Sequence, residues 1–355
     1  MKFDDLVTKA HWINKVSDTH YELFLDHHSL STFRSCEQYF QHTMMEGWAA
    51  KGKMPWFFAI GILFHEFVED YYKMKELQTL DPEVLIAHAV EAWNKALMDK
   101  NYWEDKGMTA LGGLPGYCAL ILQYCNFYQG DMERLRPIAT EIAFGKDREV
   151  KLGTFFVTRT QPSLELHMVL SADYELIQVD CYLTGRIDFL MDNGKVLGPL
   201  DHKTTAAIIG DPLEKYDPQD GMTGYIFATK AIITKNFPEL ARERKLNMMW
   251  MNFVGISNQP DANKRFKRLP LHKTDWQLEE YRLRNLTTFR RIFEMIYFEQ
   301  PAQWNTGVCG NMFRRDCQFK KVHRQSDLNS AFLVMSTDFV QKPIWNPANP
   351  NAESE

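Results

Sequence analysis

Residues 185–204 read GRIDFLMDNGKVLGPLDHKT, and this stretch decides the fold because it predicts a β-hairpin. The segment 180–191 is rich in strand-forming residues, and residues 192–195 (DNGK) are typical of a tight turn. Residues 196–202 read as the returning strand. The sequence therefore predicts two strands that a short turn joins into a hairpin.

Asp188, Asp201 and Lys203 are the charged side chains that we expect this hairpin to bring together. Side chains alternate between the faces of a strand, so Asp201 and Lys203 point the same way, and the turn brings Asp188 beside them. Carboxylates bind Mg²⁺, and the bound ion activates a water molecule to attack a phosphodiester. An ammonium group offsets the negative charge that develops on the phosphate in the transition state. The pattern predicts metal-dependent phosphodiester hydrolysis; the alternative is an ion pair on an edge strand.

The order of these residues resembles the PD-(D/E)XK nuclease superfamily, and within it the RecB-like and phage-type exonucleases, whose core hairpin reads G-x-x-D followed by D/E-x-K-T. Residues 30–40 (LSTFRSCEQYF) resemble the opening helix of that family, and residues 61–66 (GILFHE) resemble its G-x-x-x-H helix. Residues 222–228 (MTGYIFA) resemble the helix that usually carries Q-x-x-x-Y, and the segment 309–323 lies where many members keep a cysteine-rich end. The similarity covers residues 29–325.

The resemblance implies an α/β fold in which helices flank a central mixed β-sheet, a restriction-endonuclease-like core with N-terminal helical additions. We expect the nuclease domain over residues 29–325, with a helical insertion at about 78–136. An N-terminal segment, 1–28, would precede it. A C-terminal tail, 326–355, would follow, with a Pro- and Asn-rich end that we expect to be disordered.

Carried over by position, the resemblance also implies the roles of individual residues. Asp188 and Asp201 would bind Mg²⁺ or Mn²⁺, and Lys203 would be the catalytic lysine. His65 would reach the metal from its helix, and the backbone carbonyl of His202 would be a further ligand.

His65 itself lies at the border of the apolar face of its predicted helix. Glu69, one turn further on, could hold the second ring nitrogen, as ligating histidines usually require. Without the family resemblance, a border histidine that binds no metal is the alternative.

Gln219 and Tyr225 are predicted nucleic-acid contacts on the downstream helix. The position four residues before Tyr225 holds Gly221 where the family usually has glutamine. Gln219 or Asp220 would take over the role of that glutamine.

Cys36, Cys309, Cys317 and His323 form a second candidate site. RecB-like relatives often tie the opening helix to the C-terminal segment through four cysteines around an iron–sulfur cluster, and here His323 would take the fourth position. Thiolates with one imidazole can hold an iron–sulfur cluster or tetrahedral zinc. The alternative is that a cluster was lost and the thiols remain as packing residues.

The net charge of −5 divides unevenly along the chain. Residues 228–325 carry 19 Lys and Arg against 9 Asp and Glu, so this third is basic and predicts contacts with a phosphate backbone. The candidates are Lys264, Arg265, Lys267, Arg268, Arg290, Arg291, Arg314 and Arg315, with Trp250, Phe266, Trp276 and Phe289 as aromatic residues for base stacking. The alternative is an ordinary solvated face over core aromatics.

Several classes of protein are excluded by what the sequence lacks. Residues at the N-terminus contain no apolar signal-peptide core, and the longest apolar run, 56–64, is too short to span a bilayer. We therefore expect a cytoplasmic protein of a bacterial cell or phage-infected host, with no membrane contact. No G-x-x-x-x-G-K-[ST] occurs, so unwinding of DNA would need a partner such as a helicase or recombination protein.

Two functions remain from different classes. The first is a metal-dependent DNA exonuclease or end-processing nuclease in recombination, repair or phage DNA metabolism, with exonuclease favoured over endonuclease. The second is a non-cleaving nucleic-acid-binding or assembly module on a nuclease scaffold.

The remaining elements follow from periodicity and turn signals. We expect helices at 31–50, 56–77, 82–100, 115–135, 222–236 and 276–298. We expect further strands at 139–144, 154–159, 164–170, 247–256 and 265–271.

Overall fold

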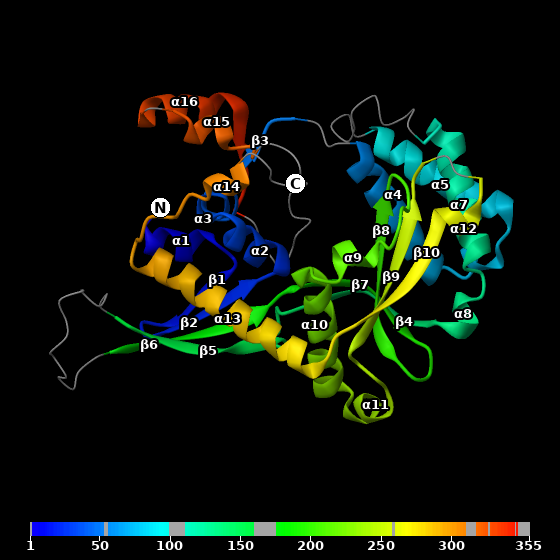
Figure 1. Ribbon diagram of the computed structural model, residues 1–355, viewed down its shortest axis with the longest axis horizontal. Coiled ribbons are helices and arrows are strands. Elements are labelled where there is room, and N and C mark those ends of the chain that lie inside the picture. Colours follow the sequence, from blue (N-terminus) through cyan, green and yellow to red (C-terminus); the bar gives the residue numbers. More distant parts are fainter. Residues whose placement is uncertain are drawn as a thin grey trace. The chain divides into compact units, whose positions relative to one another are not determined.

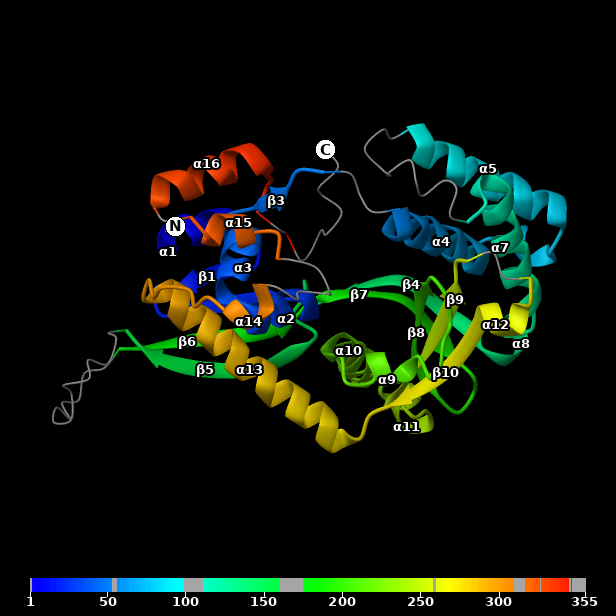
Figure 2. The same cartoon turned by 45° about the horizontal axis from the view of Figure 1, so that its top comes forward.

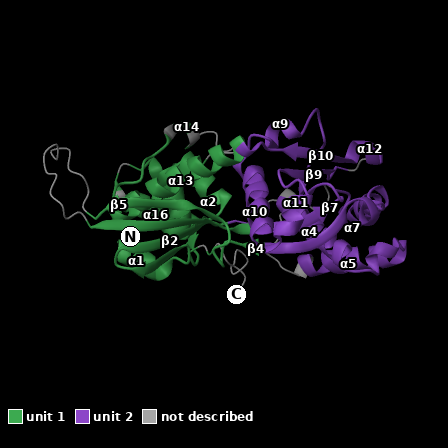
Figure 3. Cartoon of the chain, turned by 90° about the horizontal axis from the view of Figure 1, so that it is seen from below, with its two compact units in different colours: residues 1–51, 143–185, 276–355 green, residues 52–142, 186–275 purple. Residues whose placement is uncertain are grey.

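A computed structural model describes most of the 355-residue chain (Figures 1 and 2). The described residues are 2–52, 56–98, 111–159, 175–257, 260–309, 317–325, 327–344 and 346. They form two compact units, which Figure 3 colours separately. Unit 1 comprises residues 1–51, 143–185 and 276–355, and unit 2 comprises residues 52–142 and 186–275. Each unit therefore draws on segments that are far apart in the sequence.

Unit 1 is built on a four-stranded mixed sheet of order β1-β2-β6-β5, in which β2 and β6 are parallel and the outer pairs are antiparallel. Its strands are β1 (Ile13–Ser17), β2 (His20–Leu25), β5 (Lys151–Thr158) and β6 (Leu176–Leu183). The long helix α13 (Asp275–Tyr297) lies across this sheet (Figures 1 and 2), where the Phe293 ring contacts Tyr21 and Phe155.

Shorter elements complete unit 1. They are α1 (Phe3–Lys9), α2 (His27–Ser35), α3 (Glu37–Phe40), a π-helix (Gln41–Met45), α14 (Thr306–Cys309), α15 (Lys320–His323) and α16 (Leu328–Asp338). A small two-stranded sheet pairs β3 (Trp48–Ala50) with β11 (Phe339–Gln341).

Unit 2 is built on a five-stranded mixed sheet of order β10-β9-β8-β7-β4. Its strands are β4 (Arg136–Phe144), β7 (Gly185–Asp192), β8 (Leu197–Thr205), β9 (Met248–Gly255) and β10 (Phe266–His272). The helices are α4 (Trp56–Lys73), α5 (Pro82–Met98), α7 (Gly113–Phe127), α8 (Asp131–Arg134), α9 (Leu213–Tyr216), α10 (Asp220–Asn236), α11 (Pro238–Glu243) and α12 (Ala262–Arg265), with a 3₁₀ turn at Leu77–Thr79.

Helices cover both faces of the unit 2 sheet (Figure 2). Phe189 and Leu200 belong to the hydrophobic cluster of α4, α5 and α7, whereas Leu190 packs with Ile233 of α10 in a second cluster. Successive residues on a strand point to opposite faces. Asp201 therefore points to the α10 face, and the next side chain on β8 points back to the α4 and α7 face.

The hairpin turn has the geometry that its sequence predicts. Gly194 has a φ of +83°, a left-handed conformation that glycine adopts without strain. The side chain of Asn193 accepts hydrogen bonds from the backbone N–H groups of Lys195 and Val196, and the Asp192 carboxylate accepts one from Gly194 N. This local hydrogen bonding fixes the return from β7 into β8.

The predicted α/β class with helix-flanked mixed sheets is confirmed. One boundary is wrong: the segment 180–191 is not one strand, because it divides at Thr184 into the end of β6 in unit 1 and most of β7. The predicted helix 31–50 is also wrong as a single element, since it is interrupted at Cys36 and gives way to β3.

The predicted N-terminal segment 1–28 and C-terminal tail 326–355 both contribute secondary structure to unit 1, namely β1 and β2 from the first and α16 from the second. The predicted strand 164–170 lies outside the described residues, as does most of the Pro- and Asn-rich end. Among the helices that the structure describes, none has both the length and the apolar character needed to cross a membrane.

Candidate functional site

The hairpin of unit 2 brings its two aspartates to one end of the paired strands. Phe189 on β7 pairs with Leu200 on β8, so Asp188 and Asp201 are the next residues beyond that pair. The Nζ atom of Lys203 lies 3.0 Å from Oδ1 and 2.9 Å from Oδ2 of Asp201. The three charged side chains of the predicted site therefore meet within a single unit.

His65 of α4 joins this group through both of its ring nitrogens. Nδ1 lies 3.3 Å from Oδ2 of Asp188, and Nε2 lies 2.9 Å from the carbonyl oxygen of His202. A Cβ atom at Gly61 would lie 3.0 Å from Oγ1 of Thr204, so glycine at this position allows α4 to approach the end of β8. The G-x-x-x-H spacing thus has a physical reason in the structure.

The predicted support of His65 by Glu69 is wrong. Glu69 forms an ion pair with Lys73 on the same helix, and the second nitrogen of His65 contacts the carbonyl of His202 instead.

The four groups shift one another's pKa values. Burial raises the pKa of Asp201, and the neighbouring Asp188 charge adds to this rise against the lowering effect of Lys203. Burial acts to raise the pKa of Asp188, but the hydrogen bond from His65 together with the charges of His65, Lys203 and Arg186 outweighs it and lowers this pKa. For Lys203 and His65, burial lowers the pKa, but the adjacent carboxylates outweigh it and raise both values. Asp201 is therefore held beside the Lys203 ammonium group, and Asp188 is held beside the His65 imidazole.

The donor set of this site fits a hard divalent cation. The site offers two carboxylates, a backbone carbonyl and an imidazole, and Oδ2 of the buried Asp201 accepts no hydrogen bond, although it lies beside Lys203. Among the described residues, no three His, Cys, Asp or Glu side chains are close enough to form a metal site by themselves. Mg²⁺ needs no such cage, because it binds through one or two carboxylates and completes its shell with water and substrate phosphate.

The imidazole of His202 points away from this site into the core of the unit. Its Nε2 atom lies 2.6 Å from the Tyr124 hydroxyl and 3.0 Å from Nδ2 of Asn252. Burial lowers the pKa of His202 well below its usual value, so the ring is neutral. Sequence reasoning missed Tyr124 and Asn252; the one available signal was an asparagine within the apolar strand 247–256.

The structure corrects the predicted phosphate-contacting role of Arg265 and Arg268. The Arg265 side chain is buried and donates hydrogen bonds to the carbonyl of Gly255 and to Gln123. The guanidinium group of Arg268 forms a two-fold hydrogen-bonded ion pair with Asp131. Both arginines are therefore structural residues of unit 2.

Lys264 and Lys267 of the same basic run stay accessible, with Lys264 exposed and Lys267 half-buried. Among the predicted stacking residues, Trp250, Phe266 and Phe289 are buried, whereas Trp276 is 73% exposed. Arg290 pairs with Glu294, and Arg291 pairs with Glu37. The pair Arg314 and Arg315 lies outside the described residues.

Gln219 and Tyr225 both belong to the region of α10. Gln219 caps its N-terminus, is exposed, and donates from Nε2 to the carbonyl of Lys215. Tyr225 is half-buried on the second turn of the helix. Their predicted contact with nucleic acid stays a prediction.

Cys36, Cys309, Cys317 and His323 all lie in unit 1. Trp304 Nε1 donates a hydrogen bond to the Cys309 sulfur at 2.8 Å, and the neighbouring thiols together with burial raise the pKa of Cys317. Burial lowers the pKa of His323 to about 4. A zinc or iron–sulfur site needs four convergent ligands, and no group of even three such side chains converges within the described residues. A zinc or iron–sulfur site at these residues stays a prediction.

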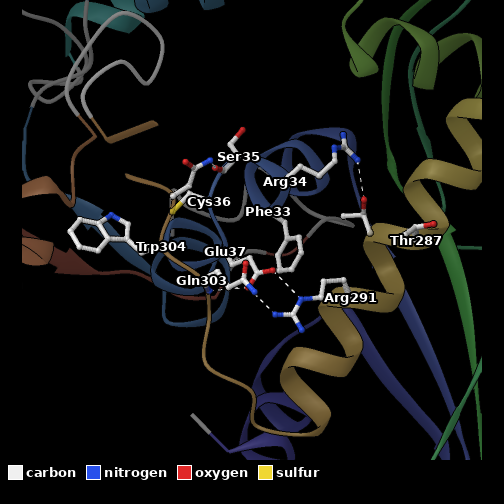
Figure 4. Close-up of a pocket in the computed structure, with 11 residues that line it drawn as sticks. Phe33, Arg34, Ser35, Cys36, Glu37, Thr287, Arg291, Gln303 and Trp304 are labelled. Atoms are coloured by element: carbon white, nitrogen blue, oxygen red, sulfur yellow. Dashed lines mark hydrogen bonds and ion pairs between the residues drawn. The ribbon is translucent and has the colours of Figure 1, made fainter. Parts of the chain in front are cut away.

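Cys36 also borders a pocket of about 420 Å³ between α2, α13 and the segment 303–305 (Figure 4). Its polar groups are bound to one another: Arg291 pairs with Glu37, and Arg34 donates to Asn285 and Thr288. The pocket is lined by side chains that hold the opening helices against α13.

A family model described as the PD-(D/E)XK nuclease superfamily matches residues 27–322. No curated protein matches the chain.

Proposed function

The chain belongs to the PD-(D/E)XK nuclease superfamily, and from that premise we propose that it is an Mg²⁺- or Mn²⁺-dependent deoxyribonuclease that hydrolyses phosphodiester bonds of DNA. The observation that carries the proposal is the meeting of Asp188, Asp201, Lys203 and His65 within one compact unit. Superfamily membership by itself indicates metal-dependent nuclease activity and a DNA substrate.

The side chains have separate tasks in this proposal. Asp188, Asp201 and the carbonyl of His202 would hold the cation, with His65 as a further ligand. A divalent cation bound there supplies Lewis-acid activation of the phosphate and of the attacking water.

Lys203 is oriented by both oxygens of the Asp201 carboxylate. Its ammonium group would offset the negative charge that grows on the phosphate oxygens, and it would hold the water that attacks phosphorus. Because neighbouring carboxylates raise the pKa of Lys203, the ammonium form is the one present near neutral pH.

We further propose that the protein is a RecB-like or phage-type enzyme that cleaves DNA as an exonuclease or an end-processing nuclease. The motif order of the sequence supports this, and the lack of a phosphate-binding loop motif in the chain supports a partner, such as a helicase, that separates strands. Recombination, repair or phage DNA metabolism in the cytoplasm would be the setting.

The test uses end-labelled single- and double-stranded DNA with Mg²⁺ or Mn²⁺. We expect cleavage by the wild type, and we expect Asp201→Ala and Lys203→Ala to lower its rate at least about 1,000-fold, because each removes a group that acts on the reacting phosphate. Gel electrophoresis of the products separates stepwise shortening from internal cuts.

Asp217→Ala is the matched control, since Asp217 forms an Asp–Lys ion pair with Lys273 in the same unit. Its cleavage rate should stay within a few-fold of the wild type. Undiminished cleavage in Asp201→Ala would exclude the proposed site, and DNA binding without cleavage by the wild type would favour the non-cleaving module.

A further inference from the structure

Three neighbouring strands of unit 2 carry a row of polar residues behind the candidate metal site. Asn252 on β9 is the register partner of both His202 on β8 and Arg268 on β10. Nε of Arg268 donates to Oδ1 of Asn252 at 2.5 Å, and Nδ2 of Asn252 lies 3.0 Å from Nε2 of His202. Asn252 has no exposed surface, so the middle of this row is excluded from water.

The donors and acceptors of this row fix one another's orientation. Arg268 offers only N–H donors, so Asn252 must turn its carbonyl oxygen toward it and its amide N–H₂ group toward His202. The His202 Nε2 atom must then accept, and it also lies 2.6 Å from the hydroxyl of Tyr124. The ring orientation that turns Nε2 toward Asn252 and Tyr124 makes both contacts, and it leaves the buried Nδ1 atom without a hydrogen-bond partner.

The far end of the row is anchored by a buried carboxylate. Both terminal nitrogens of Arg268 lie 2.6 Å from the Asp131 oxygens, and the Tyr72 hydroxyl donates to the same carboxylate at 2.7 Å. The guanidinium carbon also lies 4.2 Å from the centre of the Tyr128 ring. All three guanidinium nitrogens of Arg268 are therefore bound, and its Nε bond to Asn252 has little freedom to shift.

We propose that Arg268 and Asn252 are positioning residues of the metal site, which act through His202. The His202 ring and its carbonyl belong to one residue of β8, and that carbonyl faces His65 at 2.9 Å. Holding the ring in place therefore restrains the strand at residue 202, from which the carbonyl projects. The inference rests on the proposed function, because it assigns the His202 carbonyl as a metal ligand.

A pocket gives solvent access to the anchored end of the row. It has a volume of about 350 Å³ and is lined by Arg268, Asp131, Arg134, Tyr128 and Trp250, among others. A small guanidinium compound can enter a space of this size, so the side chain removed in Arg268→Ala can be replaced from solution.

The experiment measures Mn²⁺ binding by the electron paramagnetic resonance of the free ion, which requires no cleavage. We expect Arg268→Ala to raise the dissociation constant for Mn²⁺ about ten-fold, since residues that support ligands typically contribute that much. Arg268→Lys keeps a charge beside Asp131 but lacks Nε, so it should bind Mn²⁺ more weakly than the wild type and fold if Arg268→Ala does not.

Arg244→Ala is the matched control. Arg244 pairs with Asp192 at the turn end of the same hairpin, at 3.0 Å, so its removal also breaks a partly buried arginine–aspartate pair of unit 2. It should lose thermal stability without a change in Mn²⁺ affinity. Millimolar ethylguanidinium should restore Mn²⁺ affinity to Arg268→Ala and leave Arg244→Ala unchanged.

The outcomes separate this inference from the proposed function. If the wild type binds Mn²⁺ and both Arg268 variants bind it equally well, the positioning role is excluded while the metal site stands. If the wild type binds no Mn²⁺ and cleaves no DNA, the proposed function fails and the inference fails with it.

Discussion

His65 contacts both a carboxylate and a backbone carbonyl of the hairpin, and those two contacts distinguish it from an ordinary border histidine. A border histidine needs only a hydrogen-bond partner, whereas the Nδ1 and Nε2 atoms of His65 each face a predicted metal ligand. Against the lowering effect of burial, the hydrogen bond to Asp188 and the charges of Asp188 and Asp201 raise the pKa of His65.

His65→Ala tests this role. We expect the Mn²⁺ concentration for half-maximal cleavage to rise about 10- to 100-fold, because a ligand or its support is lost, and we expect excess metal to restore cleavage. The control is His88→Ala, since His88 also pairs with an aspartate of unit 2, Asp70. If the metal titration of His65→Ala matches that of His88→Ala, His65 is a packing residue and not a metal ligand.

Single residues also show what sequence can and cannot predict. Asp188, Asp201 and Lys203 belong to one local hairpin, so their meeting follows from strand alternation and one turn. The burial of Arg268 depends on Asp131, a partner 137 positions earlier in the chain. A run of five residues with four positive charges gives no sign of which side chains point inward.

Among the elements, the unit 1 sheet carries two acidic residues on adjacent strands. Glu22 on β2 is the register partner of Asp180 on β6, and both are buried. Arg148 donates two hydrogen bonds to Glu22, and Lys151 pairs with Asp180. Each carboxylate is thus paired with a cation of its own.

Glu22→Gln tests the pH dependence of this sheet. The hydrogen bond from Arg148 lowers the pKa of Glu22 below its ordinary value of 4.5. Its stabilising contribution is therefore complete above about pH 4.5 and is lost as the pH falls through the lower folded-state pKa. The thermal midpoint of the wild type should fall across this acidic range, and that of Glu22→Gln should be lower at pH 6 and fall less.

The comparison takes the difference between the two midpoints at each pH. A difference that stays constant from pH 6 down to the acid-unfolding range would mean that Glu22 does not titrate with folding.

The same sheet explains why one element boundary could not be predicted. Residues 180–191 are rich in strand formers, so the sequence predicts one continuous strand there. The division at Thr184 depends on which neighbours are available: β6 pairs with β2 and β5, whereas β7 pairs with β8. Pairing partners are a property of the folded chain, and local propensity does not encode them.

For the whole molecule, the basic third remains the predicted surface for DNA, although fewer of its charges are accessible than the sequence indicates. With Arg265 and Arg268 inside unit 2, the accessible charges of that run are Lys264 and Lys267. Only accessible charges displace counterions from a phosphate backbone.

The double variant Lys264→Gln and Lys267→Gln tests this surface. Each lysine that contacts a phosphate adds about 1 to the slope of log affinity against log salt concentration, so the slope should become shallower by about 2. Fluorescence anisotropy of labelled DNA at several salt concentrations measures it, with Asp201→Ala as the background to prevent cleavage.

Lys75→Gln with Lys95→Gln is the control, because both lysines are exposed and lie outside the basic third. Its slope should match that of the background. Equal slopes in both double variants would mean that the DNA-binding surface does not include residues 264–267.

The interleaving of the two units has a consequence for how the protein is made. Unit 2 ends at residue 275, whereas unit 1 still requires α13, whose Phe293 packs on the sheet beside Tyr21. At a synthesis rate of about 5 to 20 residues per second, the ribosome reaches the end of α13 roughly 1 to 4 s later. All four side chains of the candidate active site have then already left the peptidyl-transferase centre. Translation that stops in this interval releases a chain with all residues of unit 2 and an unfinished unit 1.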